Sequence, residues 1–379
     1  MRVGIDCRKI YDLQKNEGAG VERYVFHLAK SLLTVDRKND YVLFFYGDIG
    51  SETIHKVRGD NARVKIVKML RTESRLPLWT NHVRFACILR REKLDWAIFP
   101  ANVMPFFYCG KALVVVHDLA IYKHPEWFPD GQWFSRRVVV PFSVRRARAV
   151  VCVSENTKQD LLTIFHVKPE KVLAIHPGVT VKTDYLPEEM NNVLEKYGLR
   201  DGYVLYLGTI EPRKNISNLI KSFFAYLFDN EEERIKLVIA GARGWKYQPV
   251  LNELGDSNCR LAAARIIYVG KVSNRERNIL LKNCRAFVYP SYYEGFGFPV
   301  AEAMSLGVPV VTSDNSSLRE IAEDAAVLVD PDDPAALRRA LKSVLTDKVL
   351  RYHLISRGRE RAKLFDWRVA AKKILDVLK

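Results

Sequence analysis

The chain has 379 residues, more than a single hydrophobic core of ordinary size accommodates, so two domains are expected. Its composition, 48% hydrophobic and 27% charged, is that of a globular protein, and no run reaches the ~18 apolar residues of a membrane-spanning helix. The formal net charge of +16 is concentrated in residues 1–186, which hold 30 Lys and Arg against 19 Asp and Glu. These properties argue against a disordered or membrane-spanning chain.

The first ten residues, MRVGIDCRKI, place charges on both sides of a short apolar run. That pattern predicts a buried first strand and lacks the apolar core of a secretion signal, so a cytoplasmic location is expected. The cysteines are scattered without a C-x-x-C pair, and we interpret all six as reduced packing residues: Cys7, Cys87, Cys109, Cys152, Cys259 and Cys284.

Short β-branched runs alternate with segments of helical period along the whole chain, the pattern of parallel sheets covered by helices on both faces. The predicted strands are RVGIDC, YVLFFYG, VKIVKM, WAIFP, KALVVVHD, AVVCVS and VLAIHPGV, then YVLYLGT, KLVIAG, RIIYVG, AFVYPS, PVVTSD and AVLVD. A polar stretch over 181–202 separates the two series and predicts a linker with a short helix. The fold class is α/β, with doubly wound domains over 1–183 and 184–364 and an amphipathic helix within 365–379 that is expected to pack back toward the first domain.

The first domain offers two candidate ligand positions. Gly18 and Gly20 follow the first strand and precede a helical segment, so their backbone can approach a ligand closely, although an isolated G-x-G is a weak signal. His117 and Asp118 end a strand at the carboxyl edge where open sheets build sites; the alternative is a hydrogen-bonded core histidine. Ser154 is predicted to be a helix N-cap, and HPGV at 176–179 a hinge-side structural segment.

The second domain opens with YVLYLGTIEPRKN. Gly208 and Thr209 follow a strand, and Arg213 and Lys214 stand at the entrance of an amphipathic helix. Two cations at a helix start oppose its dipole, which favours an anion that they serve over a merely solvated surface. Gly241 lies at the end of the next predicted strand, where it is expected beside the nucleotide base or the acceptor.

The segment with the most candidate site residues is SYYEGFGFPVAEAM. Its pattern predicts the end of a strand, a glycine-rich turn and then a helix that begins near Pro299. Backbone N–H groups of such a turn can hold a phosphate; the residues are Gly295, Phe296, Gly297 and Phe298. Glu294 precedes the turn and Glu302 lies inside the helix. Without further evidence, the two carboxylates could equally be a loop charge and an exposed helix residue.

Metal binding has little support in the sequence. There is no H-E-x-x-H, and the D-x-D formed by Asp330 and Asp332 lies in VDPDDPAAL, where the Asp before Pro334 is more simply a helix N-cap. We expect no metal site and no cofactor, and activity without a divalent cation.

The motif Glu294, seven residues, Glu302 resembles that of the retaining GT-B glycosyltransferases of family 4, and with GTIEPRKN and TSDNSSLRE it is most similar to bacterial mannosyltransferases. The resemblance implies a GT-B fold of two Rossmann-like domains facing across a cleft, with the acceptor on residues 1–183 and the nucleotide-sugar donor on 184–364. It implies that Glu294 bonds the donor sugar and Glu302 the ribose, that Arg213 and Lys214 neutralise the leaving diphosphate, and that His117 contacts the sugar. Gly18 and Gly20 would lie beside the phosphates and acceptor.

The resemblance therefore implies a retaining, metal-independent hexosyltransferase that moves mannose from GDP-mannose onto a glycan or lipid-linked acceptor in cell-surface polysaccharide synthesis. UDP-glucose or another UDP-sugar is the alternative donor. Sugar-nucleotide epimerases and phosphorylases share two facing Rossmann domains, so the fold alone does not decide the reaction.

The basic first domain suggests a charged partner. Its segments ILRREK and RRVVVPFSVRRARAV suit anionic lipid headgroups, which would place the protein peripherally on the inner face of the membrane. A basic nucleic-acid-binding protein is a distant alternative, since an estimated pI of ≈ 9.5 suits that class as well. No recognition motif or aromatic stacking platform is present, so we expect no nucleic-acid partner; gel retardation of oligonucleotides at near-physiological salt would discriminate.

Overall fold

The fold is that of a computed structural model, which describes residues 1–13, 20–69, 79–230, 234–255 and 265–379. The chain divides into two compact units. Unit 1 comprises Met1–Pro125, Pro129–Gly178 and Phe365–Lys379, and unit 2 comprises Glu126–Phe128 and Val179–Leu364. Each unit is built on one parallel sheet.

Unit 1 holds a seven-stranded sheet in the order β3-β2-β1-β4-β5-β6-β7, with every neighbouring pair parallel. The central strands are buried on both faces because their residues are almost all apolar. The strands are β1 (Arg2–Asp6), β2 (Asp40–Tyr46), β3 (Val64–Met69), β4 (Trp96–Phe99), β5 (Lys111–Val116), β6 (Ala149–Cys152) and β7 (Val172–Ala174).

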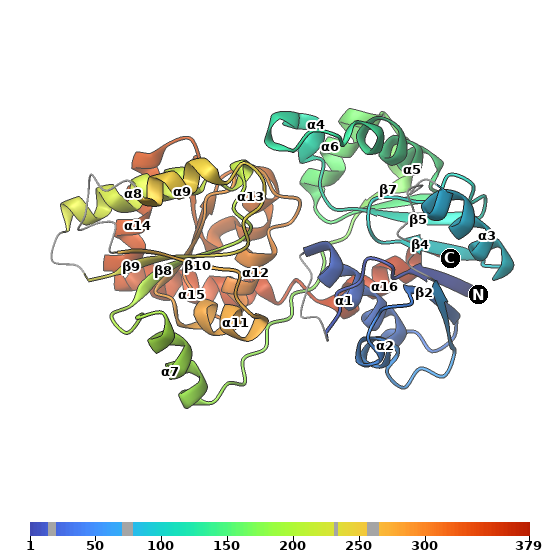
Figure 1. Cartoon of the computed structure of the whole chain (residues 1–379), viewed down its shortest axis with the longest axis horizontal. Helices are drawn as coiled ribbons and strands as arrows, with labels where there is room; N and C mark the ends of the chain where they lie inside the picture. Colours follow the sequence, from blue (N-terminus) through green and yellow to red (C-terminus); the bar gives the residue numbers. More distant parts are fainter. Residues whose placement is uncertain (14–19, 70–78, 231–233, 256–264) are drawn as a thin grey trace. The chain divides into compact units, whose positions relative to one another are not determined.

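The helices of unit 1 include one that arrives from the far end of the chain. They are α1 (Gly20–Val35), α2 (Ser51–Arg58), α3 (Phe85–Arg91), α4 (Ala120–Lys123), α5 (Val140–Arg146), α6 (Glu155–Phe165) and α16 (Trp367–Val377). Helix α16 packs beside α1 (Figure 1). There Trp367 stacks on His27, with ring centroids 5.4 Å apart, and meets the edge of Tyr24 at 5.3 Å. The amphipathic helix predicted near the C-terminus thus completes the core of unit 1.

Unit 2 holds a six-stranded parallel sheet in the order β10-β9-β8-β11-β12-β13. Its strands are β8 (Tyr203–Leu207), β9 (Lys236–Ala240), β10 (Ile266–Gly270), β11 (Ala286–Tyr289), β12 (Val310–Ser313) and β13 (Val327–Val329). Strand order reverses between β8 and β11. In open α/β sheets ligands bind outside the carboxyl ends of the strands at such a reversal.

Helices cover both faces of this sheet, as the alternation in the sequence predicts. They are α7 (Pro187–Lys196), α8 (Ile216–Asp229), α9 (Gln248–Gly255), α11 (Asn274–Asn283), α12 (Phe298–Ser305), α13 (Ser316–Ala322), α14 (Pro334–Thr346) and α15 (Lys348–Ala362). Helix α8 packs on α14, and α12 packs on α15. Helix α7 is the short helix expected within 181–202.

All thirteen predicted strands are present, and both predicted N-caps are confirmed. Ser154 accepts a hydrogen bond from the backbone N–H of Thr157 at 3.0 Å, and Asp333 accepts one from Ala336 at 2.9 Å. The expectation for the cysteines is wrong for two of them, because Cys87 and Cys109 are exposed, whereas Cys7, Cys152 and Cys284 are buried. Cys259 lies outside the described residues.

Candidate active site

The candidate site of unit 2 lies at the carboxyl ends of β8 and β11. These strands are neighbours in the sheet although about 80 residues separate them in the sequence. Parallel pairing brings the loop after β8, which carries Arg213 and Lys214, beside the loop after β11, which carries Glu294. The reversal in strand order therefore joins the two motifs that the sequence singles out.

The loop after β8 leaves the sheet through a close backbone contact. A Cβ on Gly241, at the end of β9, would stand 1.8 Å from the carbonyl oxygen of Gly208, so only glycine fits there. Thr209 follows, and its carbonyl oxygen accepts a hydrogen bond from the Tyr206 hydroxyl at 3.4 Å. The chain then makes a 3₁₀ turn, Pro212–Lys214, that leads into α8. Gly208 and Gly241 have a packing role here, independent of any ligand.

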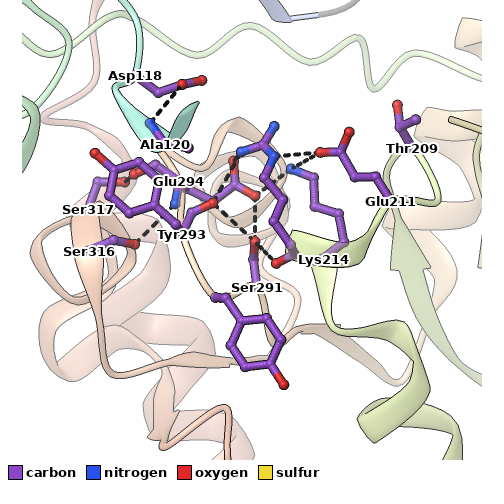
Figure 2. A network of polar contacts seen from close by, with 12 residues as sticks. Asp118, Ala120, Thr209, Glu211, Lys214, Ser291, Tyr293, Glu294, Ser316 and Ser317 are labelled. Carbon is purple, nitrogen blue, oxygen red and sulfur yellow. Dashed lines mark hydrogen bonds and ion pairs between the residues drawn. The ribbon is translucent and has the colours of Figure 1, made fainter. Parts of the chain in front are cut away.

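Four charged side chains meet at this point, two cations and two carboxylates, which we call the charge cluster: Glu211, Arg213, Lys214 and Glu294. The Nε of Arg213 donates to Glu211 Oε1 at 2.5 Å, and its Nη1 lies 3.3 Å from Glu294 Oε2. Lys214 Nζ pairs with Glu294 Oε1 and lies 3.9 Å from Glu211. All four side chains are buried or nearly so. Figure 2 shows the carboxylate of Glu294 at the centre of these contacts.

Hydroxyl groups from the last residue of β11 and from the loop after it complete the hydrogen bonding of Glu294. Tyr289 and Ser291 both donate to Oε1, at 3.0 and 2.8 Å. The Tyr289 hydroxyl also accepts from Lys214 Nζ at 2.9 Å. Behind the carboxylate, Ser316 accepts from the backbone N–H of Glu294 and Ser317 donates to its carbonyl (Figure 2). Backbone and side chain are thus both fixed, a preorganised arrangement.

The cluster shifts the pKa values of its members. Burial acts to raise the pKa of Glu294, but Lys214 and then Arg213 outweigh it and lower that pKa to about 2. Burial, reinforced by Arg213, lowers the pKa of Lys214, and the two carboxylates act against that change. Glu294 is therefore an ionised carboxylate at neutral pH, able to accept hydrogen bonds from hydroxyl groups.

The glycine-rich turn enters α12 at Gly297, which adopts a left-handed φ of +88°. The left-handed φ favours glycine, and a Cβ there would also stand 2.6 Å from Leu318 Cδ2, so a larger residue would have to displace that side chain. Gly295 is buried, and the rings of Phe296 and Phe298 meet edge to face at 5.0 Å. Pro299 lies in the first turn of α12, as expected.

Glu302 lies inside α12 and is buried, which rules out the exposed-helix interpretation. Its Oε2 pairs with Arg277 Nη2, a contact that the sequence analysis did not anticipate. Glu294 and Glu302 therefore come from the same turn and helix but are held by different cations.

Three of the predicted residues belong to unit 1. His117 follows β5 and is buried; its Nε2 lies 2.7 Å from the carbonyl oxygen of Pro100, and its backbone N–H donates to Asn102. The ring of Tyr24 meets His117 edge to face at 4.7 Å. Burial lowers the pKa of His117, so its imidazole is neutral at pH 7. Gly20 is the first residue of α1, and Gly18 lies outside the described residues.

Sequence reasoning missed four residues of the unit 2 site: Glu211, Arg277, Tyr289 and Ser291. Three of them stand within the quoted motifs, GTIEPRKN and the YPSYYEG that precedes the turn, so their proximity could have been inferred from the strand ends. Arg277 carries no such signal. In addition, the cations expected to serve a bound anion are paired with carboxylates of the chain itself.

Two features are absent from the residues that the structure describes: a metal-binding cluster and a membrane-spanning helix. In the part of the chain that the structure describes, no group of three or more His, Cys, Asp or Glu side chains is placed to hold a metal ion. Within the same residues, no helix combines the length and apolar character needed to cross a membrane.

Two family models match the chain, one on each half. The model of glycosyl transferases group 1 matches residues 192–361, and the model of glycosyltransferase family 4 matches residues 18–183. An O-antigen chain mannosyltransferase B of Escherichia coli is 30% identical over 376 residues, covering 95% of this chain and 96% of that protein. The O-antigen chain mannosyltransferase RfbU of Salmonella typhimurium is 28% identical over 63% of each chain.

Solved structures share the fold at low sequence identity. Anabaena HepE in complex with UDP and glucose aligns with a TM-score of 0.74 at 18% identity, covering 100% of this chain and 99% of that one. Sucrose-phosphate synthase from Thermosynechococcus elongatus aligns with a TM-score of 0.73 at 19% identity, covering 99% and 97%. The likeness covers both units, so the chain has the GT-B type of fold, which consists of two such α/β domains.

Proposed function

Because the chain belongs to the group 1, family 4 glycosyltransferases, we propose that it transfers mannose from GDP-mannose to a glycan or lipid-linked acceptor in cell-surface polysaccharide synthesis. The relative that is 30% identical over nearly its whole length is named for O-antigen chain mannosyl transfer, which supports the sugar and the pathway class. The proposal includes retention of anomeric configuration and independence from metal ions.

The charge cluster is the observation that carries the proposal. In glycosyl transfer the bond between the anomeric carbon and the phosphate oxygen breaks, and its electron pair leaves with the diphosphate. An acceptor oxygen then forms the new bond to that carbon and passes its proton to the departing diphosphate. Arg213 and Lys214 are positioned together in a buried site, where cations stabilise developing negative charge far better than in water.

Glu294 has a complementary part in this proposal. It is ionised, since its pKa is lowered to about 2, and it is held by Tyr289 and Ser291 on one oxygen. A carboxylate accepts several hydrogen bonds, so it can orient the hydroxyls of a donor sugar. A bound diphosphate would compete with Glu294 and Glu211 for the two cations, which couples donor binding to a rearrangement of the cluster.

The donor base is tested by a thermal-shift screen of the purified chain, without metal, against GDP, UDP and ADP and their sugar conjugates. A ligand that binds only the folded state raises the melting temperature. We expect GDP and GDP-mannose to give the shift and Glu302→Ala to abolish it, while Glu360→Ala, a surface change on α15, retains it. A shift with UDP-sugars alone would select the alternative donor; no shift with any nucleotide would contradict the proposal.

We also propose that unit 1 contacts anionic lipid. Among its described residues, the most exposed aromatic side chains are Phe107 and Trp133, which are 54% and 57% exposed, and Phe134 beside Trp133 is 37% exposed. Arg137 lies over the ring of Trp133, and Arg146 donates to the carbonyl oxygen of Cys109, two residues after Phe107 in the chain. Exposed aromatics with arginines nearby suit a membrane interface, where the ring enters the headgroup layer and the cation meets phosphate.

Co-sedimentation with vesicles tests this contact. We expect the protein to bind vesicles containing phosphatidylglycerol and to remain unbound with phosphatidylcholine alone. The double variant Phe107→Ser with Trp133→Ser should weaken binding by roughly tenfold, because each exposed aromatic contributes apolar area. Phe228→Ser, at a 79% exposed aromatic of unit 2, is the matched control. Equal binding to both vesicle types would contradict the proposal.

A further inference from the structure

The partner of Glu302 lies on a helix that none of the sequence motifs includes. Arg277 belongs to α11, and its Nη2 pairs with Glu302 Oε2 across a separation of 25 residues in the sequence. Both side chains are largely buried, with 17% and 6% of their surfaces exposed. A buried carboxylate without a cation is costly, so Arg277 compensates the charge of Glu302.

The position of Arg277 is itself well determined by the start of α11. Ser273 caps the helix by accepting from the backbone N–H of Glu276, and the Glu276 carboxylate accepts in turn from the backbone N–H of Ser273. Arg277 follows directly, and its Nη1 donates to Asn278 Oδ1 at 3.2 Å. The planar guanidinium therefore reaches Glu302 from a fixed helix terminus, and a fixed planar donor can fix the plane of the carboxylate that it holds.

This geometry affects how the site would recognise the ribose of a nucleotide. A carboxylate can accept bonds from both hydroxyls of a ribose while it also accepts from a guanidinium. A site built to bond a hydroxyl rejects the analogue that lacks it, because the buried acceptor is then left without a partner. The loss of affinity for that analogue is large only if the acceptor cannot rotate toward another partner. Arg277 holds the Glu302 carboxylate in place.

We propose that Arg277 is a positioning residue for the ribose of the donor: it fixes Glu302 and thereby sets the discrimination between ribonucleotides and 2′-deoxyribonucleotides. The inference rests on the proposed function, since it takes a nucleotide sugar as donor and Glu302 as the group that meets the ribose. It adds a residue outside both motifs and assigns it a measurable contribution to specificity.

The test measures dissociation constants by calorimetry on the full chain, for GDP against 2′-deoxy-GDP and for UDP against 2′-deoxy-UDP. For the nucleotide that the wild type binds, we expect a preference of roughly 10- to 100-fold for the ribose form. Arg277→Gln should bring the ratio close to one. Arg277→Lys, which keeps the charge without the planar fork, should give an intermediate ratio.

The control is Arg275→Gln on the same helix. Arg275 is 54% exposed and pairs with Glu189, so the change removes an arginine ion pair of α11 without touching Glu302. Its ribose preference should equal that of the wild type. If Arg277→Gln does not fold, the ratio of Arg277→Lys decides the matter, and thermal melting establishes which variants are folded.

The outcomes separate the two proposals. A wild type that binds neither ribonucleotide overturns the proposed function. A wild type that prefers the ribose form, with variants of Arg277 that keep the full preference, overturns only the role of Arg277. If the Arg277 variants bind the ribose form and the 2′-deoxyribose form more weakly by the same factor, the role of Arg277 is also overturned. A purely structural role would give that result.

Discussion

The strand ends of the two units carry contrasting chemistry on sheets of the same type. In unit 2 the loops after β8 and β11 bury the charge cluster, two acidic and two basic side chains that pair with one another and, at Glu294, with hydroxyl groups. In unit 1 the residue after β5 is His117, a neutral imidazole among the ring of Tyr24, a carbonyl and an amide. The topology provides the place for a site in both units, and the side chains decide what each place can do.

Under the proposed function, this contrast indicates which unit stabilises charge during the reaction and which unit contacts the sugar. Charge that develops on a leaving diphosphate needs buried cations, which unit 2 supplies. A neutral, hydrogen-bonded histidine can contact a sugar hydroxyl but offers little against a full charge. Substitutions in the charge cluster and at His117 should therefore differ in how much they reduce activity.

The largest effect is expected for Lys214→Met, which removes one buried cation while filling its volume. Turnover with the donor at saturation should fall about 10³-fold, and the free energy of unfolding by ~3 kcal/mol, because Glu294 loses its closest partner. Steady-state kinetics and denaturant unfolding measure the two losses. The matched control is Lys221→Met, at a 61% exposed lysine 3.8 Å from Glu253, which should change neither. Turnover within threefold of wild type would remove Lys214 from the site.

The next effect concerns pH. Burial lowers the pKa of His27 to about 4 and also lowers those of His82 and His117, all in unit 1. As pH falls below ~6.5, the unfolded chain takes up protons that these folded histidines do not bind, so the free energy of unfolding falls by up to ~1.4 kcal/mol per pH unit for each. Glu294, with a pKa of about 2, contributes stability that is complete above ~4.3 and lost below that value.

Unit 1 should accordingly lose stability between pH 6.5 and 5 while unit 2 keeps it. Hydrogen exchange, corrected for intrinsic rates and read by mass spectrometry on peptides from α1 and α12, measures the two separately. His27→Gln should reduce the loss in α1 and leave α12 unchanged. Equal losses of protection in α1 and α12 would show that the pH dependence of stability does not differ between unit 1 and unit 2.

A smaller effect is expected for His117→Asn. The substitution keeps a polar group at the strand end but shortens it, so kcat/KM should fall by only about tenfold, the size of one neutral hydrogen bond. Steady-state kinetics with GDP-mannose and a glycan acceptor measure this change. A loss as large as that of Lys214→Met would mean that unit 1 takes part in charge stabilisation after all.

No effect is expected from removal of divalent cations. If two side-chain cations stabilise the leaving group, EDTA should leave the turnover unchanged within error, and added Mg²⁺ should not restore activity to Lys214→Met. Turnover measured before and after chelation provides the check. Abolished turnover would show that the cations of unit 2 do not suffice.

Much of the fold was predictable because each strand is a short apolar run bounded by turn residues, from RVGIDC to AVLVD. The pairing of Arg213 with Glu294 was less accessible, since it depends on the order of strands in the sheet as well as on the motifs. Arg277 was out of reach, because its contact with Glu302 depends on how α11 and α12 lie against each other. Local patterns do not encode such contacts between helices.

The return of α16 to unit 1 has a consequence for synthesis. The residues of unit 1 up to Gly178 leave the ribosome first, but Trp367 and the rest of α16 follow only after all of Val179–Leu364 has been made. At ~5–20 residues per second this interval is roughly 10 to 40 s. During it, the face of α1 that includes Tyr24 and His27 is not yet packed against α16. The nascent chain therefore passes through a stage in which the unit begun first is still incomplete, and that stage is where a chaperone would find an apolar surface to bind.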